Sequence, residues 1–163
     1  MKVKKWLLGL VTFAAMVVVC AVCAGAETFG DYEYSVLNDG TVEITGYSGS
    51  AEKVDIPEKI DGKSVTSIGD RAFYDCSSLA SIMLPDGVTS IGVYAFGYCT
   101  SLTSITIPDN VVYIDDHTFC GCSNLKSIAI PNSVTEIGDS AFYDCWNLIS
   151  ITIPNSCLLY TSP

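Results

Sequence analysis

The sequence repeats itself every 23 residues, and this period restricts the chain to very few folds. Seven positions of the repeat keep the same residue through four consecutive units, which chance does not produce. One unit of this size cannot bury its own apolar face, so neighbouring units must stack into a solenoid. Three of the repeated positions make up the predicted repeat core: Phe73, Cys76, Leu79, Phe96, Cys99, Leu102, Phe119, Cys122, Leu125, Phe142, Cys145 and Leu148.

Each unit has the pattern of one turn of a coil. In the third unit, residues 125–130 alternate between inward apolar and outward small side chains, which predicts a strand of a parallel sheet. Pro131 ends the strand, because proline has no N–H for the next ladder bond. A second extended segment is expected around residues 134–137, followed by a short helical turn at Ala141-Phe142.

The repeats occupy residues 54–155, and residues 27–53 are expected to form a β-hairpin that caps their N-terminal end. Two alternating segments, Tyr32–Leu37 and Thr41–Thr45, flank the turn sequence Asn38-Asp39-Gly40. Residues 59–63 are an insertion into the first unit.

Residues 156–163 leave the register. The repeat predicts Val, Ile and Gly at positions where the chain has Cys157, Tyr160 and Thr161. We interpret this tail as the end of a truncated reading frame; a longer natural sequence that continues as a normal repeat would confirm this.

Residues 1–26 have the composition of a signal peptide. Three lysines precede an uncharged stretch from Trp6 to Ala26, and Ala24-Gly25-Ala26 offers the small residues that signal peptidase requires. The alternative is a retained membrane anchor, because the uncharged stretch is long enough to span a bilayer. Either interpretation predicts a protein that is secreted or held at the cell surface.

The remaining chain is strongly acidic. Residues 27–163 contain 5 basic and 18 acidic side chains, a formal charge of −13. This charge argues against a nucleic acid or a bare anionic membrane as the partner. We expect the protein to be attached to a membrane only if its leader is not cleaved.

The cysteine column is expected to be a stack of buried free thiols. Disulfides between neighbouring coils remain the alternative, since strand spacing lies within the range of a disulfide, although parallel side chains make its torsion awkward. Four ligands spread along a stack cannot converge on one zinc ion. Cys120 lies outside the column, so we expect it to be partly exposed and the most reactive thiol.

No pattern in the sequence predicts catalysis, a cofactor or a metal. His117 is the single histidine, it aligns with Arg71, Tyr94 and Ser140, and we expect it to face solvent. A hydrolytic triad therefore lacks its base. The aspartates near the turns are expected to be solvated or to cap turns, with weak calcium binding as the alternative.

The columns resemble the BspA-like, or treponemal-type, family of leucine-rich repeats. The resemblance extends from about Phe29 to Asn155. The residues that carry the family's motif in the second and third units are Ile91-Gly92, Ala95-Phe96, Cys99, Leu102 and Ile107-Pro108. The resemblance implies a leucine-rich-repeat solenoid with a parallel β-sheet on the concave side and short helical turns on the convex side. It also implies a secreted or surface bacterial protein, often large, whose characterised relatives bind host matrix proteins or other cells. The family has no catalytic residues to transfer.

Two surfaces are candidates for ligand contact. The first is the outward face of the sheet, which carries Ser81, Met83, Ser104, Thr106, Ser127, Ala129, Ser150 and Thr152. These small residues permit close approach, although the same residues also suit a soluble strand. The second is a group near the turns, formed by Tyr74, Tyr94, Tyr98 and Tyr143.

The sequence thus favours an adhesin-like interaction module that binds a protein or glycan through its repeat surface. A structural spacer within a larger surface protein is the alternative. An enzyme is not expected.

Overall fold

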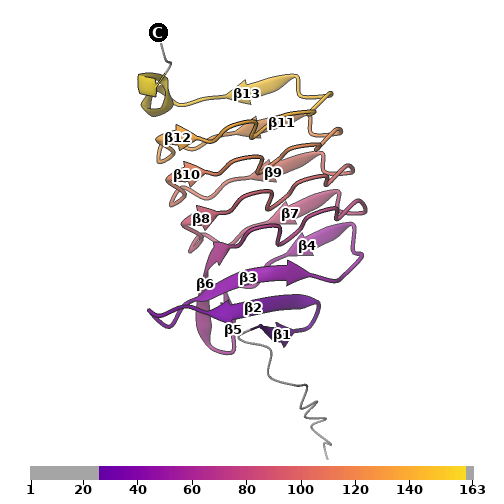
Figure 1. Ribbon diagram of the computed structural model, residues 1–163, viewed down its shortest axis with the longest axis vertical. Helices are drawn as coiled ribbons and strands as arrows, with labels where there is room; N and C mark the ends of the chain where they lie inside the picture. Colours follow the sequence, from indigo (N-terminus) through magenta and orange to yellow (C-terminus); the bar gives the residue numbers. More distant parts are fainter. Residues whose placement is uncertain (1–25, 161–163) are drawn as a thin grey trace, which may run out of the picture.

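The computed structural model describes residues 26–160, which form one stack of coils (Figure 1). The predicted leader lies outside the described residues except for Ala26, and residues 161–163 of the tail lie outside them as well. One five-stranded sheet runs the length of the stack in the order β13-β11-β9-β7-β4. Its strands are β4 (Lys53–Asp55), β7 (Ser81–Met83), β9 (Ser104–Thr106), β11 (Ser127–Ala129) and β13 (Ser150–Thr152).

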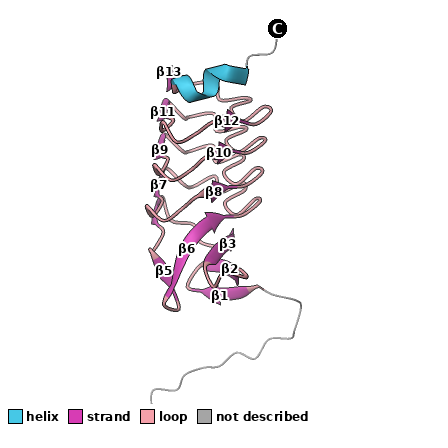
Figure 2. Cartoon of the chain, turned by 90° about the vertical axis from the view of Figure 1, so that its left-hand side faces the viewer, coloured by secondary structure: helices cyan, strands magenta, loops and turns pink. Residues whose placement is uncertain are grey.

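The second extended segment of each unit builds a second parallel sheet beside the first (Figure 2). In it β6 (Lys63–Ile68) pairs with β8 (Ser90–Ile91), which pairs with β10 (Tyr113–Ile114), which pairs with β12 (Glu136–Ile137). Each pairing joins residues one repeat apart, such as Ile68 to Ile91. The two sheets therefore share a single register with the period of the sequence.

The N-terminal end of the stack is covered by antiparallel strands. Strand β1 (Glu27–Phe29) pairs with β2 (Tyr32–Val36), and β2 pairs with β3 (Val42–Tyr47). Strand β3 then pairs in parallel with β6, which joins this hairpin to the second sheet. The insertion adds the short strand β5 (Lys59–Ile60), which folds back on β6.

The prediction of a short helical turn in each unit, as at Ala141-Phe142, is wrong in detail. The segments between the two sheets are tight turns, with local hydrogen bonds such as Tyr74 N–H to the Arg71 carbonyl at 3.0 Å. Two positions per segment adopt a left-handed backbone, with φ of 55° to 60° at residues other than glycine, and this conformation stops an α-helix. The first of these positions is occupied by Arg71, Tyr94, His117 and Ser140; the second by Asp75, Tyr98, Gly121 and Asp144.

A ladder of aromatic rings runs through the core from the hairpin to the last coil. Ring centroids follow one another at 5.5, 5.2, 5.4, 5.5 and 5.5 Å, and the rings become nearly parallel along the stack. Each coil contributes one ring, so the ladder joins every coil to its neighbours. Its members are Tyr32, Tyr47, Phe73, Phe96, Phe119 and Phe142.

The tail begins as a 3₁₀ helix, η1 (Asn155–Tyr160). The Cys157 N–H bonds to the Pro154 carbonyl at 3.0 Å, as the Val134 N–H bonds to that of Pro131 at 3.1 Å. The Cys157 thiol also donates to the Val134 carbonyl at 3.1 Å. Cys157 thus takes the place of the repeated valine although its residue type differs.

Replacing Phe96 with alanine should remove a ring from the middle of the ladder and leave a cavity. We expect the free energy of unfolding to fall by about 3–5 kcal/mol, measured by urea denaturation. Met83→Ala is the control, because Met83 is 66% exposed, and it should change the stability by less than about 0.5 kcal/mol. Equal losses in the two variants would contradict the role of the ladder.

Candidate functional site

The outward face of the five-stranded sheet brings all eight predicted sheet residues together. In-register pairing places one serine of each of β7, β9, β11 and β13 in a first column. The second column holds Met83, Thr106, Ala129 and Thr152. Ser81 is half-buried and the other seven are exposed. The face is therefore continuous and lined by short side chains.

Strand β4 extends this face by two residues that the sequence did not single out. Lys53 pairs with Ser81 and Asp55 pairs with Met83, and both are exposed. The first column thus begins with a cation and the second with an anion. The alignment of Val54 with Ile82 is the sequence signal that could have identified these two residues.

The tyrosine group forms a cluster that also contains a histidine and an arginine. Tyr74 packs edge-on against Tyr94 and Tyr98, with centroids 6.0 and 5.5 Å apart. The Arg71 guanidinium lies 5.7 Å from the centroid of Tyr94 and 6.0 Å from that of Tyr74, within the range of cation–π attraction. We call Arg71, Tyr74, Tyr94, Tyr98 and His117 the tyrosine edge.

His117 is half-buried, which corrects the expectation that it faces solvent. Its ring stacks on Tyr94 with centroids 4.6 Å apart and an angle of 3° between the planes. Its Nδ1 is buried and has no hydrogen-bond partner. Tyr94, one repeat away, covers the His117 ring. The variable residues in the column of His117 gave no sign of this contact.

Two glycines make room for the tyrosine rings. A Cβ at Gly97 would lie 2.8 Å from Tyr94 Cδ1 and 3.2 Å from Tyr74 Cδ2. A Cβ at Gly121 would lie 2.7 Å from Tyr98 Cδ1. The rings of Tyr74 and Tyr98 therefore lie against the backbone of the following coil, and the ring of Tyr94 lies against the backbone of its own coil.

Other exposed aromatic and apolar side chains lie outside this cluster. Tyr143, expected as its fourth tyrosine, is 60% exposed, and the structure records no ring contact for it. Trp146 and Ile149 are exposed where earlier units carry Ser, Thr, Ala or Lys. The repeat pattern did not predict these two side chains.

The repeated cysteines form hydrogen bonds between coils. Each thiol donates to the carbonyl oxygen of the phenylalanine in the preceding coil, at 3.1 Å for Cys99 and Cys122 and 3.2 Å for Cys145. Burial raises the pKa of the Cys99 and Cys122 thiols well above their ordinary value. It raises the pKa of Cys145 from 9.0 to about 11. All six cysteines between residues 26 and 160 are free thiols.

Cys120 is buried, which corrects the expectation of a partly exposed and reactive thiol. Its side chain is only 3% exposed, and burial raises its pKa. The neighbouring coil covers it, because the Tyr98 N–H bonds to the Cys120 carbonyl at 2.7 Å and the Tyr98 ring lies against the adjacent Gly121. A thiol with a raised pKa forms little of the reactive thiolate at neutral pH.

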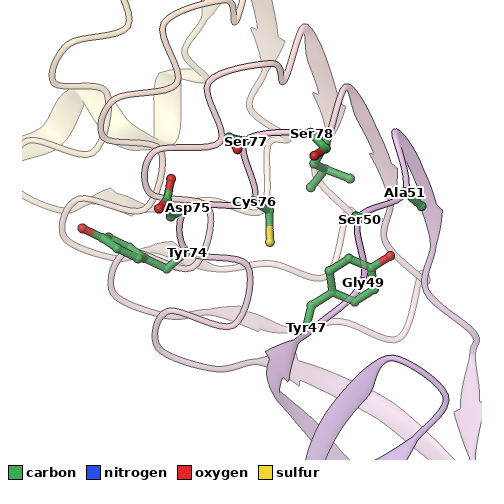
Figure 3. A pocket seen from close by; sticks show the side chains of 10 residues that line it. Tyr47, Gly49, Ser50, Ala51, Tyr74, Asp75, Cys76, Ser77 and Ser78 are labelled. Carbon is green, nitrogen blue, oxygen red and sulfur yellow. The ribbon is translucent and has the colours of Figure 1, made fainter.

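A shallow pocket of about 180 Å³ lies between the hairpin and the first turn segment (Figure 3). Tyr47, Tyr74 and Cys76 line it, and the Cys76 sulfur points towards the Tyr47 ring. The lining also includes Asp75 and three serines but no basic side chain.

Within residues 26–160, no group of three metal-binding side chains is present. No helix within residues 26–160 is long and apolar enough to cross a membrane.

The stacked parallel coils define a leucine-rich-repeat solenoid. A model of the BspA type leucine rich repeat region matches residues 46–160 in six copies. The chain belongs to this BspA-type leucine-rich-repeat family, as the columns predicted. No curated protein matches the chain.

Solved structures of bacterial leucine-rich-repeat proteins share the fold. A Treponema pallidum protein is 36% identical over 80% of this chain, with a TM-score of 0.76, and the match spans 61% of that protein. A Bacteroides capillosus protein is 32% identical over 78% of this chain and 96% of its own, with a TM-score of 0.69. A Bacteroides ovatus protein is 30% identical over 80% of this chain and 42% of its own, with a TM-score of 0.70.

The buried thiols should make the protein sensitive to alkali. Because burial raises the pKa of Cys145 from 9.0 to about 11, the folded chain keeps a proton that the unfolded chain loses in this range. The contribution of this thiol is complete below pH 9 and is lost as the pH rises to about 11. Urea denaturation across this range should show a smaller loss of stability in Cys145→Ala than in the parent chain. Identical pH profiles would contradict this.

Proposed function

We propose that this chain is a secreted or cell-surface interaction module that binds a protein partner on a host or neighbouring cell. The charged, apolar and small-residue segments of residues 1–26 support export. Membership of the repeat family supports a role in protein interaction. The module acts by binding and has no catalytic step.

The observation that carries the proposal is the exposed face of the five-stranded sheet. Five in-register strands hold two straight columns at the spacing of neighbouring strands, about 4.8 Å, and from β9 to β13 both columns consist of short side chains. Short side chains let a partner approach the sheet closely and lose little conformational entropy on binding. Met83 adds a flexible apolar contact that adapts to a partner.

The acidic charge of the chain selects among partners. With 5 basic and 18 acidic side chains in residues 27–163, complementary partners carry positive charge. Association with such a partner weakens as the salt concentration rises.

Export can be tested on the purified full chain. After expression in a bacterium with its own leader, Edman degradation should show Glu27 as the first residue. Recovery of the uncleaved 17.4 kDa chain in the membrane fraction would instead identify the leader as an anchor. A lysine-free leader is the control, since it should abolish export in both cases.

The sheet face can be tested in a binding screen of the exported chain against extracellular-matrix proteins and glycans. Ser104→Arg with Thr106→Arg places two long charged side chains in the middle of the face. We expect this variant to lose at least about 2 kcal/mol of binding free energy to the selected partner. Biolayer interferometry measures the loss, and thermal unfolding checks the fold.

The matched control is Ser64→Arg with Thr135→Arg, which adds the same charge at exposed positions outside the face. It should bind within about threefold of the parent chain. Equal loss in both variants would assign the effect to net charge. A folded chain that binds nothing in the screen would favour the structural spacer.

A further inference from the structure

The tyrosine edge has a chemistry that differs from that of the sheet face. It exposes 44% of Tyr74 and 41% of Tyr98, although aromatic rings gain free energy when they leave water. These rings come from the turn segments at residues 69–77 and 92–100, which precede strands β7 and β9 in the chain. A second contact with a partner is the simplest use of such a surface.

We propose that the tyrosine edge binds a basic segment of a partner protein, with arginine or lysine side chains on the faces of Tyr74 and Tyr98. The inference rests on the proposed function, since it assumes a protein partner. It adds the chemistry of that partner and the surface that recognises it.

The chain itself contains one example of the interaction. Arg71 holds its guanidinium over Tyr94 and Tyr74, at 5.7 and 6.0 Å from the ring centroids. The same edge therefore already accommodates one cation against aromatic faces. Tyr98 has no cation from the described part of the chain against its ring, and its exposed surface is open to one from outside.

The charge around the rings also suits a cation. The turn segments 69–77, 92–100, 115–123 and 138–146 contain six aspartates and a single arginine. One of the aspartates, Asp75, stands in the same repeat column as Tyr98 one coil away, and its N–H bonds to the carbonyl of Gly97 at 2.8 Å. A cationic side chain on Tyr98 would thus combine cation–π attraction with attraction to carboxylates.

The neighbouring pocket adds hydrogen-bond acceptors. It adjoins Tyr74 and is lined by hydroxyl groups of Tyr47, Ser50 and Ser77, with no basic side chain. A guanidinium or an ammonium group carries only donors and needs such acceptors.

The rings are arranged before any partner arrives. Tyr74 contacts two other rings, and the absence of a Cβ at Gly97 and Gly121 lets the rings lie on the backbone. Binding therefore costs little ordering of the edge itself. An anionic segment would meet Asp75 and the overall negative charge of the chain and be repelled.

The test uses the full exported chain and a fluorescein-labelled octa-arginine peptide, with octaserine as the uncharged probe. Fluorescence anisotropy should show saturable binding of octa-arginine and none of octaserine. Tyr74→Leu with Tyr98→Leu keeps apolar bulk and removes the aromatic faces, and we expect about tenfold weaker binding. The matched control is Tyr113→Leu with Tyr143→Leu, outside the edge, which should bind within about twofold of the parent.

A charge pair separates local from overall attraction. Asp75→Asn should weaken binding more than Asp86→Asn, which removes the same charge at an exposed site outside the edge. Equal affinity in the two tyrosine variants, or equal loss in the two aspartate variants, would overturn the proposal and leave only a diffuse acidic field. Thermal unfolding verifies that each variant is folded.

The two proposals fail separately. If the sheet-face variant keeps its partner while the tyrosine variant loses octa-arginine, the proposed sheet contact is wrong and the tyrosine edge stands. If the sheet-face variant loses its partner while the tyrosine variant binds octa-arginine as the parent does, only the tyrosine edge is wrong.

Discussion

Contact between residues one repeat apart is the constraint on which the rest of the structure depends. Strand pairing joins Ile82 to Ile105 and Ile105 to Ile128, and the rings of Phe96 and Phe119 stack 5.5 Å apart. In the turn segments, backbone N–H groups alternate between local bonds and bonds to the next coil, as at Phe73, Tyr74 and Asp75. No coil therefore satisfies its backbone or its apolar side chains alone. The cap, the thiol bonds and both candidate surfaces all follow from this stacking.

The sequence predicted what the period controls. The parallel strands, the inward isoleucines and the stacked phenylalanines each follow from identical residues that recur at the same position. The outward columns of the sheet followed from the same alternation, since neighbouring side chains of a strand point to opposite faces. The Asn38-Asp39-Gly40 turn located the hairpin in the same direct way, because it stands between two alternating segments.

Features that depend on unlike neighbours could not be predicted in this way. Cys120 is covered by Tyr98 and His117 by Tyr94, and in each case the covering residue lies in the adjacent coil at a variable position. The left-handed backbone at Arg71, Tyr94 and His117 carries no glycine, so the sequence alone does not distinguish these turn segments from helical turns. A repeat column shows which residue types a position tolerates across all coils. The burial of one side chain at a variable position depends instead on the residue that lies against it in the adjacent coil.

In-register stacking also has a consequence for how such a protein can change in evolution. Because each coil contacts only the coils on either side, duplication or loss of one whole 23-residue unit lengthens or shortens the stack by about one strand spacing and leaves every remaining contact type intact. A change of another length keeps the register of both sheets only where the extra residues fold out of the coil, as residues 59–63 do around β5. Recombination between neighbouring repeats can therefore alter the reach of the molecule in fixed steps, while point substitutions at variable positions diversify its surface independently.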